Sequence, residues 1–252
     1  MSSWTHLWRR WVSARQSWGL APLGQAWVLV GLTRQNQNLA KVQTMAVLLA
    51  PEGPAPNDLT WLSQDLRLKV RTSMAARRRL NMALQMDQLQ EGYIDFPVAV
   101  AKSEWLYEVQ LEVSLALQLR PEEVSFDFAA EALSNGLVQR VHWMGCAKAR
   151  MEALKNCTRA AGCRLATVES ETQAASRAVR ALQGGVASLL TLAPQDWQFR
   201  WGSAGADVAN LHPQALAPSV SDAQVQEAIE SFMPTPSGAR LVASGLALGA
   251  WT

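Results

Sequence analysis

The sequence contains few cysteines, only three in 252 residues. Cys146, Cys157 and Cys163 are an odd number, and their spacings match neither a zinc site nor a Cys-x-x-Cys motif. A chain with so few thiols and no disulfide framework is typical of a reducing compartment. We therefore expect three buried thiols without a metal or redox role.

Histidines, net charge and short catalytic motifs are also sparse. His6, His142 and His212 lie far apart and lack ligand-spaced partners, so no metal site is predicted. The formal net charge is only +2. Nucleic-acid-binding proteins carry concentrated patches of Lys and Arg instead, so no nucleic-acid partner is expected. The sequence has no Gly-x-Ser-x-Gly, P-loop or His-Glu-x-x-His motif, and no catalytic residue is predicted.

Long hydrophobic runs are absent as well. No stretch approaches the roughly 20 apolar residues that a helix needs to cross a bilayer. Residues 1–25 lack the apolar core and the cleavage site of a signal peptide. We expect a cytoplasmic protein.

The chain does contain enough apolar residues for a substantial core. At 49% hydrophobic and 17% charged, 252 residues can form one large or two small domains. Strand and helix patterns alternate along the chain, which predicts an α/β or α+β fold. Strand patterns cover residues 26–33, 39–50, 80–85, 92–96, 124–128, 137–147 and 164–168, and helix patterns cover 58–73, 103–117, 148–161 and 170–182.

Residues 1–25 are basic and rich in tryptophan. In a helix, Trp4, Trp8 and Trp11 would share one face, while Arg9 and Arg10 would lie elsewhere. Tryptophan favours the lipid interface and arginine favours anionic headgroups, so this segment predicts peripheral contact with the inner membrane. A helix packed on the protein's own surface and a disordered tail are equally open interpretations.

The stretch from residue 103 to residue 128 organises the rest of the chain. Its first part is a helix pattern that Ser103 can cap, and Pro121 ends the helix pattern. Its second part alternates apolar and polar residues as a half-buried strand does. The apolar positions are Leu106, Val109, Val113 and Leu117 in the helix and Val124, Phe126 and Phe128 in the strand.

This stretch resembles a segment of PilM, the actin-like cytoplasmic protein of type IV pilus assembly. The resemblance rests on the helix with Glu112, on Pro121-Glu122-Glu123-Val124, and on Asp127-Phe128. Gln118 and Arg120 stand where the family has prolines. Further pieces follow in the family's order, including Cys146-Ala147-Lys148, Val168-Glu169 with Thr167 in place of an aspartate, and the C-terminal Ala243-Ser244-Gly245-Leu246-Ala247-Leu248.

The resemblance covers most of residues 26–183 and 208–249, and it implies a partial actin-like (ribonuclease H-like) first lobe. Residues 26–74 and 208–252 would form the core subdomain. Residues 77–168 would form an inserted small α+β subdomain. Residues 169–207 would be a helix and a shortened, loop-like linker in place of the family's second lobe.

In an actin-like fold the polar hairpin tip at residues 34–38 would hold phosphate. Lys41 is present, but Thr33 replaces the family's aspartate. Gln35, Asn36 and Gln37 replace the small residues that let backbone N–H groups approach phosphate. We therefore expect no nucleotide or other cofactor.

The function that the resemblance implies is binding rather than catalysis. In the PilM family, the groove between the two subdomains receives the cytoplasmic N-terminal peptide of PilN, an inner-membrane protein. A PilN-like partner is therefore expected, and the candidate contact residues are Glu112, Pro121, Glu123 and Asp127. Glu112 and Asp127 could equally cap or brace the fold. The protein would act in the cytoplasm, peripherally at the inner membrane.

Two other functions stay open. One is a reduced actin-like ATPase that binds nucleotide alone or as a dimer, the homo-oligomer that would complete the cleft. The other is a regulator that competes with a full-length PilM for the same peptide.

Overall fold

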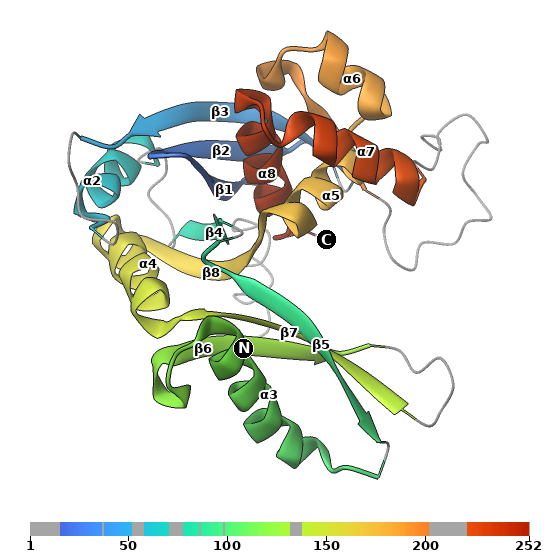
Figure 1. Cartoon of the computed structure of the whole chain (residues 1–252). Helices are drawn as coiled ribbons and strands as arrows, with labels where there is room; N and C mark the ends of the chain where they lie inside the picture. The colour runs from blue at the N-terminus through green and yellow to red at the C-terminus, as the bar shows by residue number, and fades with distance from the viewer. Residues whose placement is uncertain are drawn as a thin grey trace, which may run out of the picture. The chain divides into compact units, whose positions relative to one another are not determined.

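The computed structural model describes residues 16–251 except residues 37, 52–57, 71–77, 86, 98, 132–137 and 202–220. The chain divides into two compact units. The first unit comprises Met1–Pro54, Thr60–Leu84 and Thr158–Thr252, and the second comprises Ala55–Leu59 and Gln85–Cys157. Each unit has its own sheet, as Figure 1 shows.

The first unit contains a six-stranded sheet in the order β8-β4-β1-β2-β3-β9. Strands β1, β2, β3 and β9 are antiparallel neighbours, whereas β4 runs parallel to both β1 and β8. The strands are β1 (Gln16–Leu23), β2 (Ala26–Arg34), β3 (Leu39–Leu49), β4 (Arg78–Leu84), β8 (Cys163–Ser170) and β9 (Gln198–Arg200).

Strand β1 corrects the predicted N-terminal segment. Residues 16–25 were expected to belong to the basic segment, but Gln16–Leu23 is a strand near the middle of the sheet. Its positions from Ser17 to Pro22 are buried because helices or neighbouring side chains cover both faces, so it lacks a strand's alternation. Trp4, Trp8, Arg9, Arg10 and Trp11 lie outside the described residues.

Helices cover the sheet of the first unit. Its helices are α2 (Thr60–Lys69), α5 (Glu171–Ala181), α6 (Gly185–Thr191), α7 (Asp222–Phe232) and α8 (Pro236–Leu248). The predicted apolar face of α2 is confirmed, since Leu62 and Leu66 are buried. The predicted cap of α5 is also confirmed, because the Ser170 hydroxyl accepts a hydrogen bond from the Gln173 N–H.

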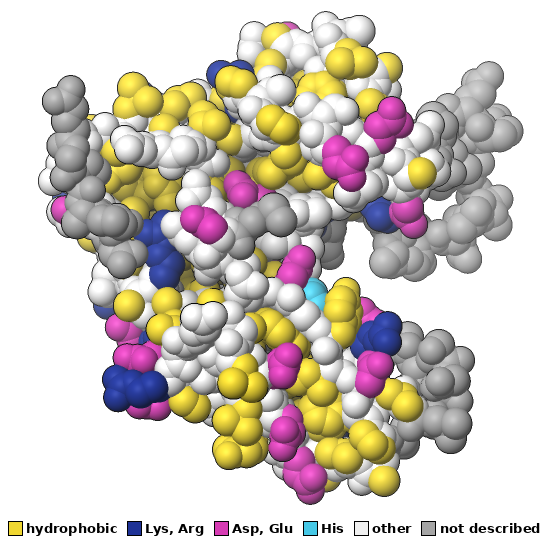
Figure 2. Space-filling model, in the orientation of Figure 1, with side chains coloured by type: hydrophobic (Ala, Val, Ile, Leu, Met, Phe, Trp, Pro, Cys, Tyr) yellow, Lys and Arg dark blue, Asp and Glu magenta, His cyan; other side chains and the backbone are white. Residues whose placement is uncertain are grey.

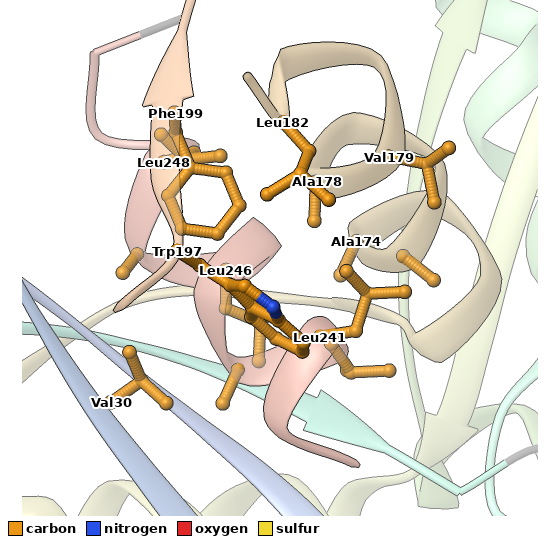
Figure 3. Close-up of a cluster of buried hydrophobic side chains, with 14 of the residues drawn as sticks. Val30, Ala174, Ala178, Val179, Leu182, Trp197, Phe199, Leu241, Leu246 and Leu248 are labelled. Carbon is orange, nitrogen blue, oxygen red and sulfur yellow. The ribbon is translucent and has the colours of Figure 1, made fainter. Parts of the chain in front are cut away.

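Residues 184–207 were expected to be loop-like, and this prediction is wrong for the described part. The segment forms α6, a short 3₁₀ turn η2 (Pro194–Asp196) and β9. Trp197 and Phe199 are almost fully buried. Figure 3 shows their rings among side chains of α5 and α8, so this segment completes the core of the first unit.

The second unit is a three-stranded antiparallel sheet in the order β5-β7-β6, with helix α3 on one face. Its elements are β5 (Gln90–Pro97), α3 (Lys102–Leu117), the 3₁₀ turn η1 (Pro121–Glu123), β6 (Val124–Ala130), β7 (Val138–Ala147) and the start of α4 (Lys148–Ala160). The predicted helix and the three predicted strands are confirmed. Two details differ: the residue before α3 is Ala101 rather than the predicted cap Ser103, and Leu106 is exposed while Trp105 is buried.

The boundaries of the inserted subdomain also differ from the prediction of residues 77–168. Strands β4 and β8 pair with each other in parallel within the sheet of the first unit. Leu80, Met82 and Leu84 are fully buried there. The insertion therefore starts after β4 and ends before β8. The predicted helix of residues 169–207 is α5, and α6 and β9 lie where the linker was predicted.

Helix α8 makes the closest backbone contacts in the first unit. A Cβ atom on Gly245 would lie 1.8 Å from the Ala174 carbonyl oxygen in α5, and one on Gly19 would lie 1.9 Å from the Ala243 carbonyl oxygen. The Asn81 side chain in β4 donates to the Leu246 carbonyl at 2.7 Å. Only glycine allows this approach, so α8 is fixed between β1 and α5.

Replacing Gly245 by alanine is expected to lower the free energy of unfolding by about 3 kcal/mol or more, because the added methyl must displace backbone rather than a flexible side chain. Urea denaturation measures this change. The control is Gly249→Ala: Gly249 is exposed at the end of the same helix with φ of −56°, and a Cβ atom there would lie 2.9 Å from the Arg177 guanidinium, the end of a flexible side chain, rather than against the backbone of another element. It should lower stability by less than Gly245→Ala does. Equal losses in both variants would contradict the packing role of Gly245.

Candidate functional site

The hairpin tip between β2 and β3 uses its own backbone N–H groups. The amides of Gln35 and Asn36 both donate to the Leu39 carbonyl, at 2.8 and 3.4 Å. The Asn38 amide donates to the Asn36 side-chain oxygen at 3.0 Å. A phosphate site needs several backbone N–H groups directed at the anion. These three amides are already bonded within the tip.

Packing against tryptophan also holds this tip. The Arg34 guanidinium donates to the Asn36 carbonyl at 3.0 Å and lies 5.7 Å from the centre of the Trp201 ring. The Trp201 amide donates to the Asn38 carbonyl at 3.1 Å, and the Trp201 ring stacks on Trp251 with centroids 5.5 Å apart. Contacts with Trp201, just after β9, therefore hold the tip in this conformation.

Thr33, which stands in place of the family's aspartate, is bonded inside the sheet. Its hydroxyl donates to the side-chain oxygen of Gln43, which also accepts from the Gln16 amide group at 3.0 Å. The Lys41 side chain is exposed. No carboxylate stands at position 33 to bind a metal–phosphate group.

The acidic residue in β8 that matches the family's Asp-Val-Glu pattern is held by an ion pair. Both carboxylate oxygens of Glu169 accept from Arg177 in α5, at 2.6 and 2.8 Å. Arg177 also donates to the Gly245 carbonyl at 2.9 Å. Thr167 donates to the Asn81 side chain at 3.0 Å. Glu169 and Thr167 therefore help to fix α8 through Arg177 and Asn81, which donate to carbonyls of that helix.

The four predicted contact residues in the second unit do not share one surface. Asp127 alternates with Phe126 and Phe128, which pack in the core beneath α3, so its side chain lies on the opposite face of the sheet. There it accepts a hydrogen bond from the Phe128 N–H at 2.9 Å. Glu112 is exposed on α3. The sheet separates the two carboxylates.

Pro121 and Glu123 form part of the turn between α3 and β6. The Gln110 side chain donates to the Pro121 carbonyl at 2.8 Å. Glu123 accepts from the Arg120 guanidinium at 2.9 and 3.2 Å and from the Arg120 backbone N–H at 3.3 Å. Hydrogen bonding to Arg120 lowers the pKa of Glu123 below its ordinary value. Both residues therefore brace the turn, whereas Glu112 has no such bond among the described residues.

The outward face of α3 carries a ridge that the sequence patterns did not reveal. Tyr107, Leu111 and Leu115 recur every four residues and so lie on one line along the helix. Tyr107 is 63% exposed and Leu115 is 74% exposed. We call this line the α3 ridge. Beside it runs a second line of exposed carboxylates, Glu104, Glu108 and Glu112. Figure 2 shows acidic and hydrophobic side chains next to each other over α3.

The other face of the three-stranded sheet carries a cluster of polar side chains. Arg140 in β7 binds both carboxylate oxygens of Asp95 in β5, at 2.8 and 2.9 Å, and this hydrogen bonding lowers the pKa of Asp95. The Tyr93 ring packs on His142 with centroids 4.8 Å apart. Glu91 lies 3.7 Å from the same histidine. The ion pair of Arg140 with Asp95 and the ring contact of Tyr93 with His142 both join β5 to β7, so the cluster stabilises this pair of strands.

The predicted buried thiols are confirmed. Cys146, Cys157 and Cys163 are free and buried, and burial raises the pKa values of Cys146 and Cys163. Within the described ranges, no group of three or more His, Cys, Asp or Glu side chains is arranged to hold a metal ion. Among the same residues, no helix is long and apolar enough to span a membrane.

Comparison with known proteins identifies the fold. No protein-family model matches the sequence, and no curated protein matches it. A chain of the PilM-PilN type IV pilus biogenesis complex is similar in structure, with a TM-score of 0.54 and 19% identity over 65% of this chain and 50% of that chain. This protein therefore spans half the length of that chain.

Two more solved structures are more distantly similar. The cytoplasmic domain of EpsL, an inner-membrane component of the type II secretion system of Vibrio cholerae, has a TM-score of 0.47 and 11% identity over 63% of this chain and 58% of that one. A Bacteroides thetaiotaomicron protein with an actin-like ATPase fold and unknown function has a TM-score of 0.36 and 12% identity over 72% and 62%. The similarity to the chain of the PilM-PilN complex confirms the expected α/β fold.

Proposed function

We propose that this protein is a non-catalytic scaffold of type IV pilus assembly that binds the cytoplasmic N-terminal peptide of a PilN-like inner-membrane protein. The observation that carries the proposal is the similarity of its fold to half of a chain in a PilM-PilN complex. The sequence resemblance around Glu112 and Pro121 supports the same family of partners.

The bonded hairpin tip supports a binding role without catalysis. Its amides at Gln35, Asn36 and Asn38 are occupied, and Glu169 is held by Arg177. Each group would have to break an internal bond to act on a nucleotide. A scaffold needs none of these groups free.

The α3 ridge is the surface that we propose for the peptide. Cytoplasmic segments next to membrane-spanning helices are enriched in Lys and Arg. Such a peptide can pack apolar side chains on Tyr107 and Leu115 and place a basic side chain near Glu112. An apolar ridge with carboxylates beside it complements both parts of the peptide.

Replacing Glu112 by lysine is expected to weaken peptide binding about five- to tenfold, because one attraction at an exposed site is lost and one repulsion is added. Fluorescence anisotropy with the labelled N-terminal peptide of the PilN-like protein measures the dissociation constant. Asp127→Lys is the matched control, since it makes the same change in charge on the other face of the sheet. Circular dichroism verifies that both variants are folded.

Three results separate the parts of this proposal. Binding by the wild type and by Asp127→Lys, with a loss in Glu112→Lys, supports both the partner and the surface. Equal binding by all three proteins would show that the peptide does not bind at the α3 ridge. A folded wild type that does not bind the peptide would contradict the proposed PilN-like partner itself.

ATP with magnesium is expected to bind with a dissociation constant weaker than about 1 mM, which corresponds to less than about 4 kcal/mol of binding free energy. The reason is the occupied hairpin tip with Thr33 in place of a carboxylate. Isothermal titration calorimetry checks this expectation. Micromolar binding, or hydrolysis that Lys41→Ala abolishes, would favour the reduced ATPase instead.

We also propose that Trp4, Trp8, Arg9, Arg10 and Trp11 hold the protein peripherally at the inner membrane. Each arginine near an anionic surface contributes about 1 kcal/mol, so binding to anionic vesicles should weaken as salt is added. Co-sedimentation with phosphatidylglycerol vesicles tests the idea. The variant with both arginines changed to glutamine should sediment less than the wild type at low salt, and equal sedimentation would refute the proposal.

A further inference from the structure

Among the described residues, the outer edge of β3 is unpaired over most of its length. Only Leu39–Lys41 pairs with β9, and the Val42 N–H donates to the Trp197 carbonyl at 3.4 Å. From Gln43 to Leu49, no strand of the described residues pairs with this edge. Figure 1 shows β3 as a long strand beside β2. An open edge presents unpaired N–H and C=O groups to another chain.

The open part of β3 lacks the features that usually protect an edge. Residues 44–49, Thr-Met-Ala-Val-Leu-Leu, contain no charge and no proline. One irregularity occurs before them at Gln43, which has no partner in β2. Val47 is 41% exposed and Leu49 is 71% exposed. Figure 2 shows hydrophobic side chains gathered over this region. Short uncharged segments of this kind pair readily with other strands.

We infer that the β3 edge pairs with the same edge of a second copy, in an antiparallel arrangement about a two-fold axis. If the axis passes through Val47, that residue lies opposite its own copy, and Leu49 lies opposite Met45 of the second copy. Both exposed side chains then contact apolar partners. Because the segment is uncharged, the two copies do not repel each other.

A closed dimer of two β3 edges suits this edge better than a filament in which β3 of one copy pairs with β8 of the next. The opposite edge of the sheet is β8, whose Arg164 is exposed and whose Glu169 is bonded to Arg177. Pairing β3 with β8 would have to match an apolar edge with a charged one and would build an open filament. Two-fold pairing of β3 instead covers both open edges and stops at a dimer. The area is small, so the dimer should be weak and should form as concentration rises.

Sedimentation velocity of the full chain over a concentration series tests the association. We expect a monomer–dimer equilibrium in the wild type and a monomer throughout in Val47→Lys, whose charge would face its copy. A wild type that stays monomeric at every concentration overturns the inference. A dimer that Val47→Lys leaves unchanged overturns it too, because the interface would then lie elsewhere.

A disulfide test checks the position of the axis. Directly opposite residues of antiparallel strands have Cα atoms about 4.5–5.5 Å apart, which lies within the range of about 4.4–6.8 Å that a disulfide accepts. Val47→Cys should form a disulfide-linked dimer at least about tenfold faster than Leu68→Cys, because pairing positions the two thiols for reaction. Leu68 is a fitting control, since it is 63% exposed on α2. The native cysteines are buried and contribute little background. Equal rates in the two variants would overturn the two-fold pairing at Val47.

Discussion

Contact between bare backbones holds the first unit together. Helix α8 touches β1 at Gly19 and α5 at Gly245, and neither contact has room for a Cβ atom. Asn81 and Arg177 then donate to carbonyl groups in the last turn of the helix. The Gly249 N–H at the end of the helix also donates to both of these carbonyls, at 3.1 and 3.2 Å, so the two side chains add to the helix's own hydrogen bonds. The position of α8 therefore depends on glycine at positions 19 and 245 and on the hydrogen bonds from Asn81 and Arg177 to its last turn.

This packing uses polar side chains around α8. Thr167 donates to Asn81, Asn81 donates to the Leu246 carbonyl, and Arg177 donates both to Glu169 and to the Gly245 carbonyl. Breaking the pair of Glu169 and Arg177 would leave a partly buried charge without its partner, at a cost in stability. These polar side chains stabilise the fold, and this is consistent with the proposed binding role.

The sequence predicted most of the elements but not their grouping. Period-two and period-3.6 patterns revealed α3, β6 and the capped α5 because these elements have one exposed face. Strand β1 has no alternation because it is buried on both faces, and unlike the equally buried β2 it contains a proline, Pro22, a residue that is depleted in strands. The pairing of β4 with β8 spans a long insertion, and local patterns carry no information about it. Asp127 and Glu112 were grouped because both belong to the segment that resembles PilM, although the sheet lies between them. The sequence also did not predict that the edge of β3 is unpaired, because this follows from the order of the strands in the sheet.

The order of the elements along the chain also sets an order of folding. The second unit is nearly continuous, Gln85–Cys157, so it can form from contacts between residues close in sequence. The sheet of the first unit has to wait for β8, and its core has to wait for α8, which the ribosome makes after every strand of that sheet. At about 5–20 residues per second, synthesis leaves the apolar strands β1 to β4 without their covering helix for several seconds or longer. The nascent protein thus exposes the surface that α8 later covers, and during that interval it depends on whatever else in the cell can shield apolar strands.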